Sequence, residues 1–186
     1  MNTWNSKKDC RSFFKTLCAQ NFERGLVHHQ QQLDFHLRDF LKSQSGTWGA
    51  YRALPLEAGV EVFAAMPNLT WVFPRMKDGR LEFCQPTSFV EGPFGVREPA
   101  PGSVVVDLSK VQGLLIPGLA FNKNGTRLGK GLGFYDKSLE SFSGLKVGVC
   151  FDFQIAEPTL PHETHDIQVD WIVTESGAFE CEQQRQ

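Results

Sequence analysis

The chain has 186 residues, of which 41% are hydrophobic and 22% are charged, and these proportions are close to those of an ordinary globular protein. They exclude a disordered chain, a collagen-like fibre and a coiled-coil rod. The 19 basic and 21 acidic residues nearly cancel, so the positive field of a dedicated nucleic-acid-binding protein is absent. We expect one domain over residues 1–186 with no nucleic-acid partner.

Neither a membrane span nor an export signal is visible in the sequence. No apolar run approaches the ~18 residues that a spanning helix needs, and the amino terminus lacks the charged and then apolar order of a secretory signal. We therefore expect a cytoplasmic protein with no membrane partner. The five cysteines are scattered without a C-x-x-C pair, which favours reduced, buried thiols over disulfides or a zinc site.

The sequence of the first half of the chain predicts helices followed by strands. Apolar residues at helical spacing over residues 7–43 predict two helices or one broken helix. Residues 46–54 predict a short strand, residues 56–66 a helix, and residues 70–75 a second strand. Asp78-Gly79 then separates this strand from the next one with the spacing of a hairpin.

The second half continues the alternation of strands and helices. Residues 86–102 hold four of the ten prolines and three glycines, which predicts a surface loop. Strands are expected at residues 113–116, 145–151 and 171–175, with a helix beginning near Phe134. This order predicts an α/β fold with a mostly parallel sheet covered by helices.

A glycine-rich stretch, residues 117–139, carries the strongest functional signal. Four of its glycines, at 125, 129, 131 and 133, surround Arg127 and Lys130, and the stretch then leads through Asp136 into the expected helix. Glycines let backbone N–H groups converge on an anion, and a helix start adds a favourable dipole, so the pattern suits a phosphate site. A purely structural glycine-rich turn is the alternative. The spacing fits neither the Walker A loop nor the Rossmann fingerprint.

Carboxylates near this stretch suggest a cation site. Asp136 closes the stretch, and Asp166 and Asp170 precede the last strand; Asp136 with Asp166 could hold a hard cation beside phosphates. The alternative for Asp136 is a helix-capping role. His162 and His165 are three residues apart, whereas the zinc-protease motif needs four, so we expect no zinc chemistry there.

The stretch PGLAFNKNGTRLGKGLGFYD at residues 117–136 resembles the signature of the 5-formyltetrahydrofolate cyclo-ligase family. Further segments are similar to that family's pattern: Lys7 with Arg11, Glu57, Pro74-Arg75, Phe94-Gly-Val-Arg-Glu-Pro99, and the run from His165-Asp166 to Glu175. Leu132 departs from the basic residue that many members carry at this position, and Phe134 replaces a frequent tyrosine.

The resemblance implies a three-layer α/β sandwich like that of sugar-phosphate isomerases and CoA transferases. It also implies an ATP- and Mg²⁺-dependent enzyme that phosphorylates the formyl oxygen of 5-formyltetrahydrofolate. N10 then attacks and phosphate leaves, which gives 5,10-methenyltetrahydrofolate. The substrate would be accepted with or without a polyglutamate tail, by a monomer or weak dimer.

By the same resemblance, each site residue has an expected role. ATP would be bound by Lys7, Arg11, Arg75, Gly125, Arg127, Leu128, Gly129, Lys130, Gly131, Gly133, Phe134 and Tyr135. Arg127 and Asp136 would be catalytic, with Asp136 and Asp166 on the magnesium ion. The folate would meet Tyr51, Glu57, Phe94 and Tyr135, although Tyr51 and Phe94 are equally compatible with core packing.

Two alternatives remain open at this stage. The first is a nucleotide-binding paralogue with the same fold that does not turn over folate. The second is a sugar-phosphate isomerase or acyl-CoA transferase, which would need neither the magnesium site nor the pair of Lys7 and Arg11.

Overall fold

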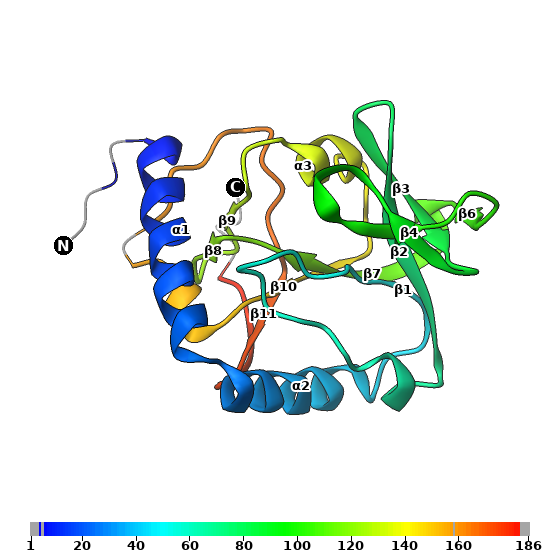
Figure 1. Ribbon diagram of the computed structural model, residues 1–186, viewed down its shortest axis with the longest axis horizontal. Helices are drawn as coiled ribbons and strands as arrows, with labels where there is room; N and C mark the ends of the chain where they lie inside the picture. Colours follow the sequence, from blue (N-terminus) through cyan, green and yellow to red (C-terminus); the bar gives the residue numbers. More distant parts are fainter. Residues whose placement is uncertain (1–3, 5, 158, 183–186) are drawn as a thin grey trace.

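An eight-stranded sheet forms the middle of the computed structural model, which describes residues 4, 6–157 and 159–182 (Figure 1). The strand order is β12-β11-β10-β7-β1-β2-β3-β6, and the five strands from β11 to β2 run parallel. The parallel strands are β1 (Gly46–Gly49), β2 (Leu69–Lys77), β7 (Val111–Pro117), β10 (Leu145–Val149) and β11 (Trp171–Thr174). The antiparallel strands at the two sides are β3 (Arg80–Gln85), β6 (Val104–Val106) and β12 (Gly177–Glu180).

Both faces of the sheet are covered, as the alternation of side chains along β7 requires. Leu115 packs on one face, in the same cluster as the buried residues of helix α2 (Val27–Leu41). Leu114 and Ile116 pack on the other face, in a cluster with Leu139, which follows helix α3 (Phe134–Ser138). Figure 1 shows α2 and α3 on opposite sides of the sheet. The predicted α/β fold with a mostly parallel sheet between helices is confirmed.

Two separate helices occupy the amino-terminal region, which resolves the alternative left open by the sequence. Ser6 caps α1 (Lys7–Arg24) by accepting a hydrogen bond from the amide of Asp9, and Gly25 ends the helix with a backbone φ of 86°. Cys10 and Phe14 of α1 pack in one cluster with Leu128 of the glycine-rich stretch. This packing holds the first turn of α1 against that stretch.

The prediction of a helix over residues 56–66 is wrong. Only a short 3-10 helix, η1 (Phe63–Ala65), is present there. Ala58, Val60 and Val62 are buried while the residues between them are not, so the burial repeats every two residues, as in an extended chain. Leu56, the first residue of the segment, has a left-handed backbone with φ of 69°, which is incompatible with a regular helix start.

The hairpin predicted at Asp78-Gly79 is confirmed, since Lys77 and Arg80 face each other across it.

Elsewhere, the structure adds short elements that the sequence did not predict. The predicted loop at 86–102 carries a small hairpin, β4 (Phe89–Glu91) and β5 (Arg97–Pro99), joined by η2 (Pro93–Gly95). The glycine-rich stretch contains the short pair β8 (Ala120–Phe121) and β9 (Arg127–Leu128). The remaining 3-10 helices are η3 (Leu108–Lys110) and η4 (Asp152–Gln154).

The cysteine prediction is confirmed, because all five are free and buried. A search of the described residues finds no helix that is long and apolar enough to cross a membrane.

Candidate active site

The topology places a crevice between β1 and β7. The chain leaves β1 towards β2 on one side, and it leaves β7 towards β10 on the other. In open α/β sheets, ligands bind at the carboxyl ends of the strands where the direction of winding changes in this way. A pocket of about 430 Å³ lies there, lined by Tyr51 just after β1 and by Pro117 and Gly118 at the end of β7.

Most of the predicted site residues line this pocket. They are Lys7, Arg11, Tyr51, Glu57, Phe94, Arg127, Leu128, Gly129, Lys130, Gly131, Gly133, Phe134, Tyr135, Asp136 and Asp166. They come from α1, from the segment after β1, from the β4–β5 hairpin, from the glycine-rich stretch with α3, and from the segment before β11.

Two predicted ATP-binding residues, Arg75 and Gly125, are not among the lining residues. Arg75 donates to Glu82 on the neighbouring strand, with the shorter N–O distance 2.6 Å, and to the carbonyl of Ala100. Gly125 has φ of 88°, and a Cβ there would lie 2.4 Å from the carbonyl oxygen of Val169. Their contacts are those of a structural ion pair and a tight turn.

Arg127 is the most buried cation of the pocket, with only 5% of its side chain exposed. Its Nη2 lies 3.2 and 3.3 Å from the two carboxylate oxygens of Asp136, and its Nη1 donates to the carbonyl of Pro117 at 3.2 Å. Its Nε is buried without a hydrogen-bond partner, and its guanidinium carbon lies 5.2 Å from the centre of the Tyr135 ring. The side chain is thus fixed in orientation and retains one unused donor.

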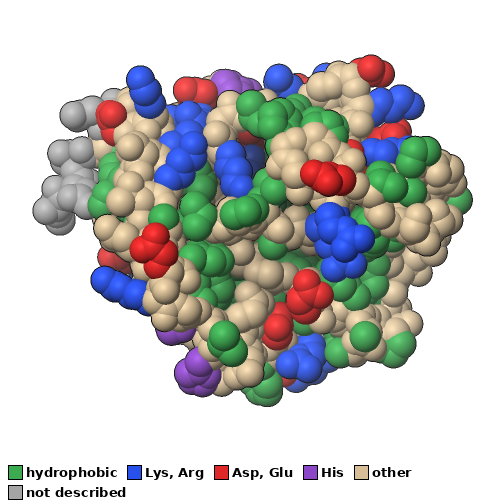
Figure 2. Space-filling view, in the orientation of Figure 1, with side chains coloured by type: hydrophobic (Ala, Val, Ile, Leu, Met, Phe, Trp, Pro, Cys, Tyr) green, Lys and Arg blue, Asp and Glu red, His purple; other side chains and the backbone are tan. Residues whose placement is uncertain are grey.

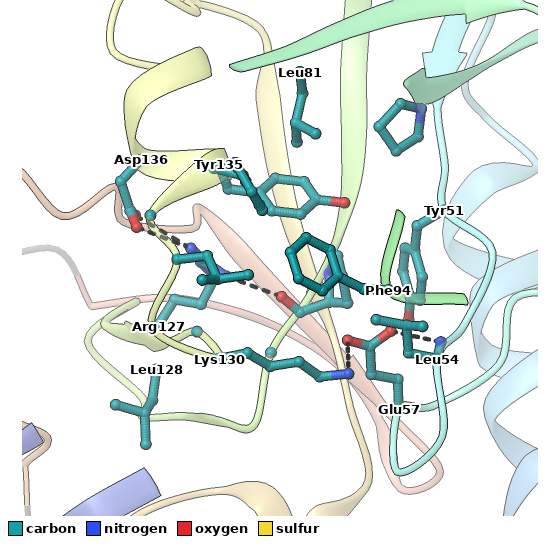
Figure 3. A pocket seen from close by; sticks show the side chains of 18 of the residues that line it. Tyr51, Leu54, Glu57, Leu81, Phe94, Arg127, Leu128, Lys130, Tyr135 and Asp136 are labelled. Atoms are coloured by element: carbon teal, nitrogen blue, oxygen red, sulfur yellow. Dashed lines mark hydrogen bonds and ion pairs between the residues drawn. The ribbon is translucent and has the colours of Figure 1, made fainter. Parts of the chain in front are cut away.

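A second ion pair crosses the pocket from Lys130 to Glu57 (Figure 3). The Nζ to Oε1 distance is 2.8 Å, and Oε2 of Glu57 accepts a hydrogen bond from the amide of Leu54. The Glu57 side chain is only 7% exposed. A buried carboxylate needs such partners, because burial without them disfavours its charge.

Lys7 joins the first turn of α1 to the acidic segment before β11. Its Nζ lies 2.6 Å from Asp166 and 2.9 Å from Glu163. Burial alone raises the pKa of Asp166, but hydrogen bonds from Lys7 and the Glu163 amide outweigh it and lower that pKa. For Lys7, burial alone lowers the pKa, but the carboxylates of Asp166 and Glu163 outweigh burial, so the pKa of Lys7 is raised.

The same segment holds a group of possible metal ligands. One ligand atom each of Glu163, His165 and Asp166 lies within 4.8 Å of the others. Asp166 therefore has neighbours that suit a cation, and two of the three side chains offer the oxygen ligands that Mg²⁺ prefers. Asp136 is outside this group; its carboxylate accepts from Arg127 and from the amide of Ile167.

Aromatic side chains form the rest of the wall. Phe94 is 66% exposed, has a left-handed backbone with φ of 61°, and lies between Tyr135 and Tyr51 in Figure 3. Its ring centre is 6.4 Å from that of Phe134. Tyr51 is both core and wall, because it is 2% exposed, donates to the carbonyl of Ala58 and still lines the pocket. Burial first, and then the Glu57 carboxylate, raise the pKa of Tyr51 and Tyr135, which keeps both phenols neutral.

Several lining residues were not assigned to the site from the sequence. They are Arg52, Leu54, Pro74, Met76, Leu81, Val96, Arg97, Glu98, Pro117, Gly118, Leu132, Glu163 and His165. Arg97 and Glu98 stand inside the family-like segment at 94–99, and Arg52 adjoins Tyr51, so their places in the chain were available as signals. Leu54 and Leu81 carry no such signal, because ordinary core leucines look the same in a sequence.

Comparisons with known proteins identify the family of this chain. The model of the 5-formyltetrahydrofolate cyclo-ligase family matches residues 51–175. A 5-formyltetrahydrofolate cyclo-ligase of Saccharomyces cerevisiae is 36% identical over 97 residues, which cover 48% of this chain and 44% of that protein. One from Escherichia coli K12 is 40% identical over 79 residues, or 41% and 43% of the two chains. The chain thus matches less than half the length of these curated relatives.

Solved structures extend the match to nearly the whole chain. The 5,10-methenyltetrahydrofolate synthetase of Aquifex aeolicus aligns with a TM-score of 0.77 and 28% identity, covering 97% of this chain and 95% of its own. The synthetase of Mycoplasma pneumoniae aligns with a TM-score of 0.74, and at 20% identity it supports the fold alone. Since the family model spans more than half of the chain, the resemblance seen in the sequence is confirmed, and this chain belongs to the 5-formyltetrahydrofolate cyclo-ligase family.

Proposed function

We propose that this protein converts 5-formyltetrahydrofolate to 5,10-methenyltetrahydrofolate with ATP and Mg²⁺, releasing ADP and phosphate. The observation that supports it most is the meeting, in one pocket, of the buried Arg127–Asp136 pair with an aromatic wall. Phosphoryl transfer needs fixed positive charge, and a pterin needs aromatic surfaces. We also propose a single-domain cytoplasmic protein, monomeric or weakly dimeric, with no nucleic-acid or membrane partner.

The proposed reaction has two steps that share the pocket. The formyl oxygen attacks the γ-phosphorus of ATP, an O–P bond forms, and ADP leaves. N10 of the folate then attacks the formyl carbon, and phosphate departs with the former formyl oxygen as N10 loses its proton. Because negative charge is transferred and then released, both steps gain from cations that are already oriented.

The residues present suit these steps. Arg127 would neutralise the transferred phosphoryl group, because its side chain lines the pocket and Asp136 holds its guanidinium in place. Lys7 and Arg11 would bind the remaining phosphates from the first turns of α1. Lys130 pairs with Glu57 beside the aromatic wall, where this carboxylate could receive the N10 proton.

Magnesium would neutralise phosphate charge, and the carboxylates of Asp136 and Asp166 are the ligands proposed for it. The chemistry of the donors fits at Asp166, whose neighbour Glu163 offers a second carboxylate. Asp136 is partly exposed, at 18% of its side chain, so its carboxylate remains accessible from the pocket.

An absorbance assay for the methenyl product tests the proposal. Purified protein with 5-formyltetrahydrofolate, ATP and Mg²⁺ is expected to form product, whereas omission of ATP or addition of EDTA abolishes it. Product that forms equally well without ATP would contradict the proposal.

A nucleotide-binding paralogue without folate turnover is the second candidate. Leu132 favours it, because this side chain is 51% exposed at the pocket where many family members carry a basic residue. ATP binding without any product would select this candidate.

A further inference from the structure

The basic residues that line the pocket differ in how they are neutralised. Lys7, Arg127 and Lys130 each have a carboxylate oxygen within 3.2 Å. Arg11, Arg52 and Arg97 line the same pocket and lack such a close partner; Arg11 donates to the carbonyl of Gly129 beside the other cations, whereas Arg52 and Arg97 come from the segment after β1 and from the β4–β5 hairpin. A cation that its own protein leaves weakly neutralised inside a pocket is available to a bound anion.

Arg52 is held in place by aromatic rings instead of by a carboxylate. Its guanidinium carbon lies 4.6 Å from the centre of the Phe89 ring, and Phe63 and Phe73 are at 5.2 and 5.3 Å. Its nearest acidic group is Glu61, at 3.8 Å and with 69% of the side chain exposed. Stacking fixes the plane of a guanidinium and leaves its N–H edge free, which is the geometry that a planar carboxylate uses.

Arg97 stands beside this cluster on the β4–β5 hairpin. Phe89, the ring nearest to Arg52, belongs to β4, and β4 pairs with the strand that carries Arg97. Arg97 is exposed, and no hydrogen bond or ion pair joins it to another described residue, although Glu91 is its cross-strand neighbour. In Figure 2, basic side chains gather beside α1 and again near β4.

The chemistry of the proposed substrate indicates what Arg52 and Arg97 would bind. The formyl group must lie near Arg127 and the phosphates, so the glutamyl end of the folate, with its carboxylates, must point away from them. In Figure 3, Tyr51, which precedes Arg52 in the chain, lies beyond Phe94 from Arg127 and Asp136. We propose that Arg52 and Arg97 form a carboxylate site for the glutamyl end of the folate, an inference that rests on the proposed function.

The test compares two ligands that differ only in charge at this end: 5-formyltetrahydrofolate and its α,γ-diamide. In the wild-type protein, we expect the diamide to bind about tenfold more weakly and to have a kcat/KM lower by about the same factor. In Arg52→Gln and Arg97→Gln, the difference between the two ligands should fall to about threefold or less. An unchanged tenfold difference in both variants would overturn the inference.

Matched variants separate this role from folding. Arg52→Lys keeps the charge and loses the planar guanidinium, and Arg97→Gln changes an exposed side chain, so it tests the site even if Arg52→Gln unfolds. Arg24→Gln, at the exposed end of α1, is the control that should keep the full difference.

Binding is also measured by fluorescence titration without ATP, so the inference has a readout that turnover does not supply. Charge-dependent binding without turnover would sink the proposed function alone. Turnover with no preference for the charged ligand would sink the carboxylate site alone. If wild-type protein binds neither ligand, both proposals fail.

Discussion

The pocket has two sides that are built in opposite ways. On the loop side, formed by Lys7, Arg127 and Lys130, each cation has a carboxylate oxygen within 3.2 Å. On the hairpin side, formed by Arg52, Phe94 and Arg97, Phe94 and Arg97 are exposed, and the ion pair of Arg52 with Glu61 is longer, at 3.8 Å. Charges that are already positioned suit a reacting phosphoryl group, whereas an open side suits recognition of the rest of a substrate.

Substitutions on the loop side should reduce turnover most, and substitutions on the hairpin side should mainly weaken folate binding. The largest effect is expected for Arg127→Ala. Loss of a buried donor to the transferred group should lower kcat/KM for ATP about 10³-fold. Steady-state kinetics and ATP titration measure this. Equal losses of ATP and folate affinity would contradict the assignment of Arg127 to the phosphates.

The second largest effect is expected for Asp136→Asn. The amide oxygen can still accept from Arg127 and from the amide of Ile167, so the free energy of unfolding should change by only about 1 kcal/mol. Turnover should fall at least about 10²-fold, because the negative charge beside Arg127 is gone. Denaturant unfolding and kinetics are measured together. A large loss of stability with retained activity would mean that Asp136 only caps its helix.

The pair of Lys130 and Glu57 should show an intermediate effect. Glu57→Gln keeps the shape and removes the charge that would receive the N10 proton, so we expect kcat/KM for the folate to fall about tenfold, mainly through kcat. In a double-mutant cycle with Lys130→Met, the second change should add little once the first is present, because the two side chains act as one ion pair. Fully additive effects would show that the two residues work independently.

The smallest effect is expected for Phe94→Gly. Phe94 has φ of 61°, which costs a non-glycine residue about 1 kcal/mol, so glycine should slightly raise the free energy of unfolding. The lost ring should raise KM for the folate several-fold and leave KM for ATP unchanged. A rise in both KM values would place this ring nearer the nucleotide than the comparison of the two sides allows.

Local signals in the sequence predicted part of this fold well. The β2–β3 hairpin followed from Asp78-Gly79, and the break between the first two helices followed from the apolar spacing. Residues 56–66 were mistaken for a helix because a short run of Ala and Val fits both periods. In the folded chain, the segment is extended and the Glu57 carboxylate contacts Lys130 and the Leu54 amide, and the first of these contacts is not visible from local sequence.

The candidate site was also predicted only in part. The glycine-rich stretch was found because its residues are close together in the chain. Arg52 was not assigned to the pocket although it adjoins Tyr51, and its contacts with the rings at 63, 73 and 89 arise only in the folded chain. Arg75 was included because it adjoins a family-like proline, whereas its guanidinium is taken up by Glu82 across the hairpin.

The most direct test follows the formyl oxygen. The substrate is labelled with ¹⁸O in its formyl group and turned over with ATP and Mg²⁺, and the released inorganic phosphate is analysed by mass spectrometry. The proposed chemistry predicts one ¹⁸O atom in the phosphate for each methenyl product formed. Methenyl product accompanied by unlabelled phosphate would contradict phosphoryl transfer to the formyl group in this pocket.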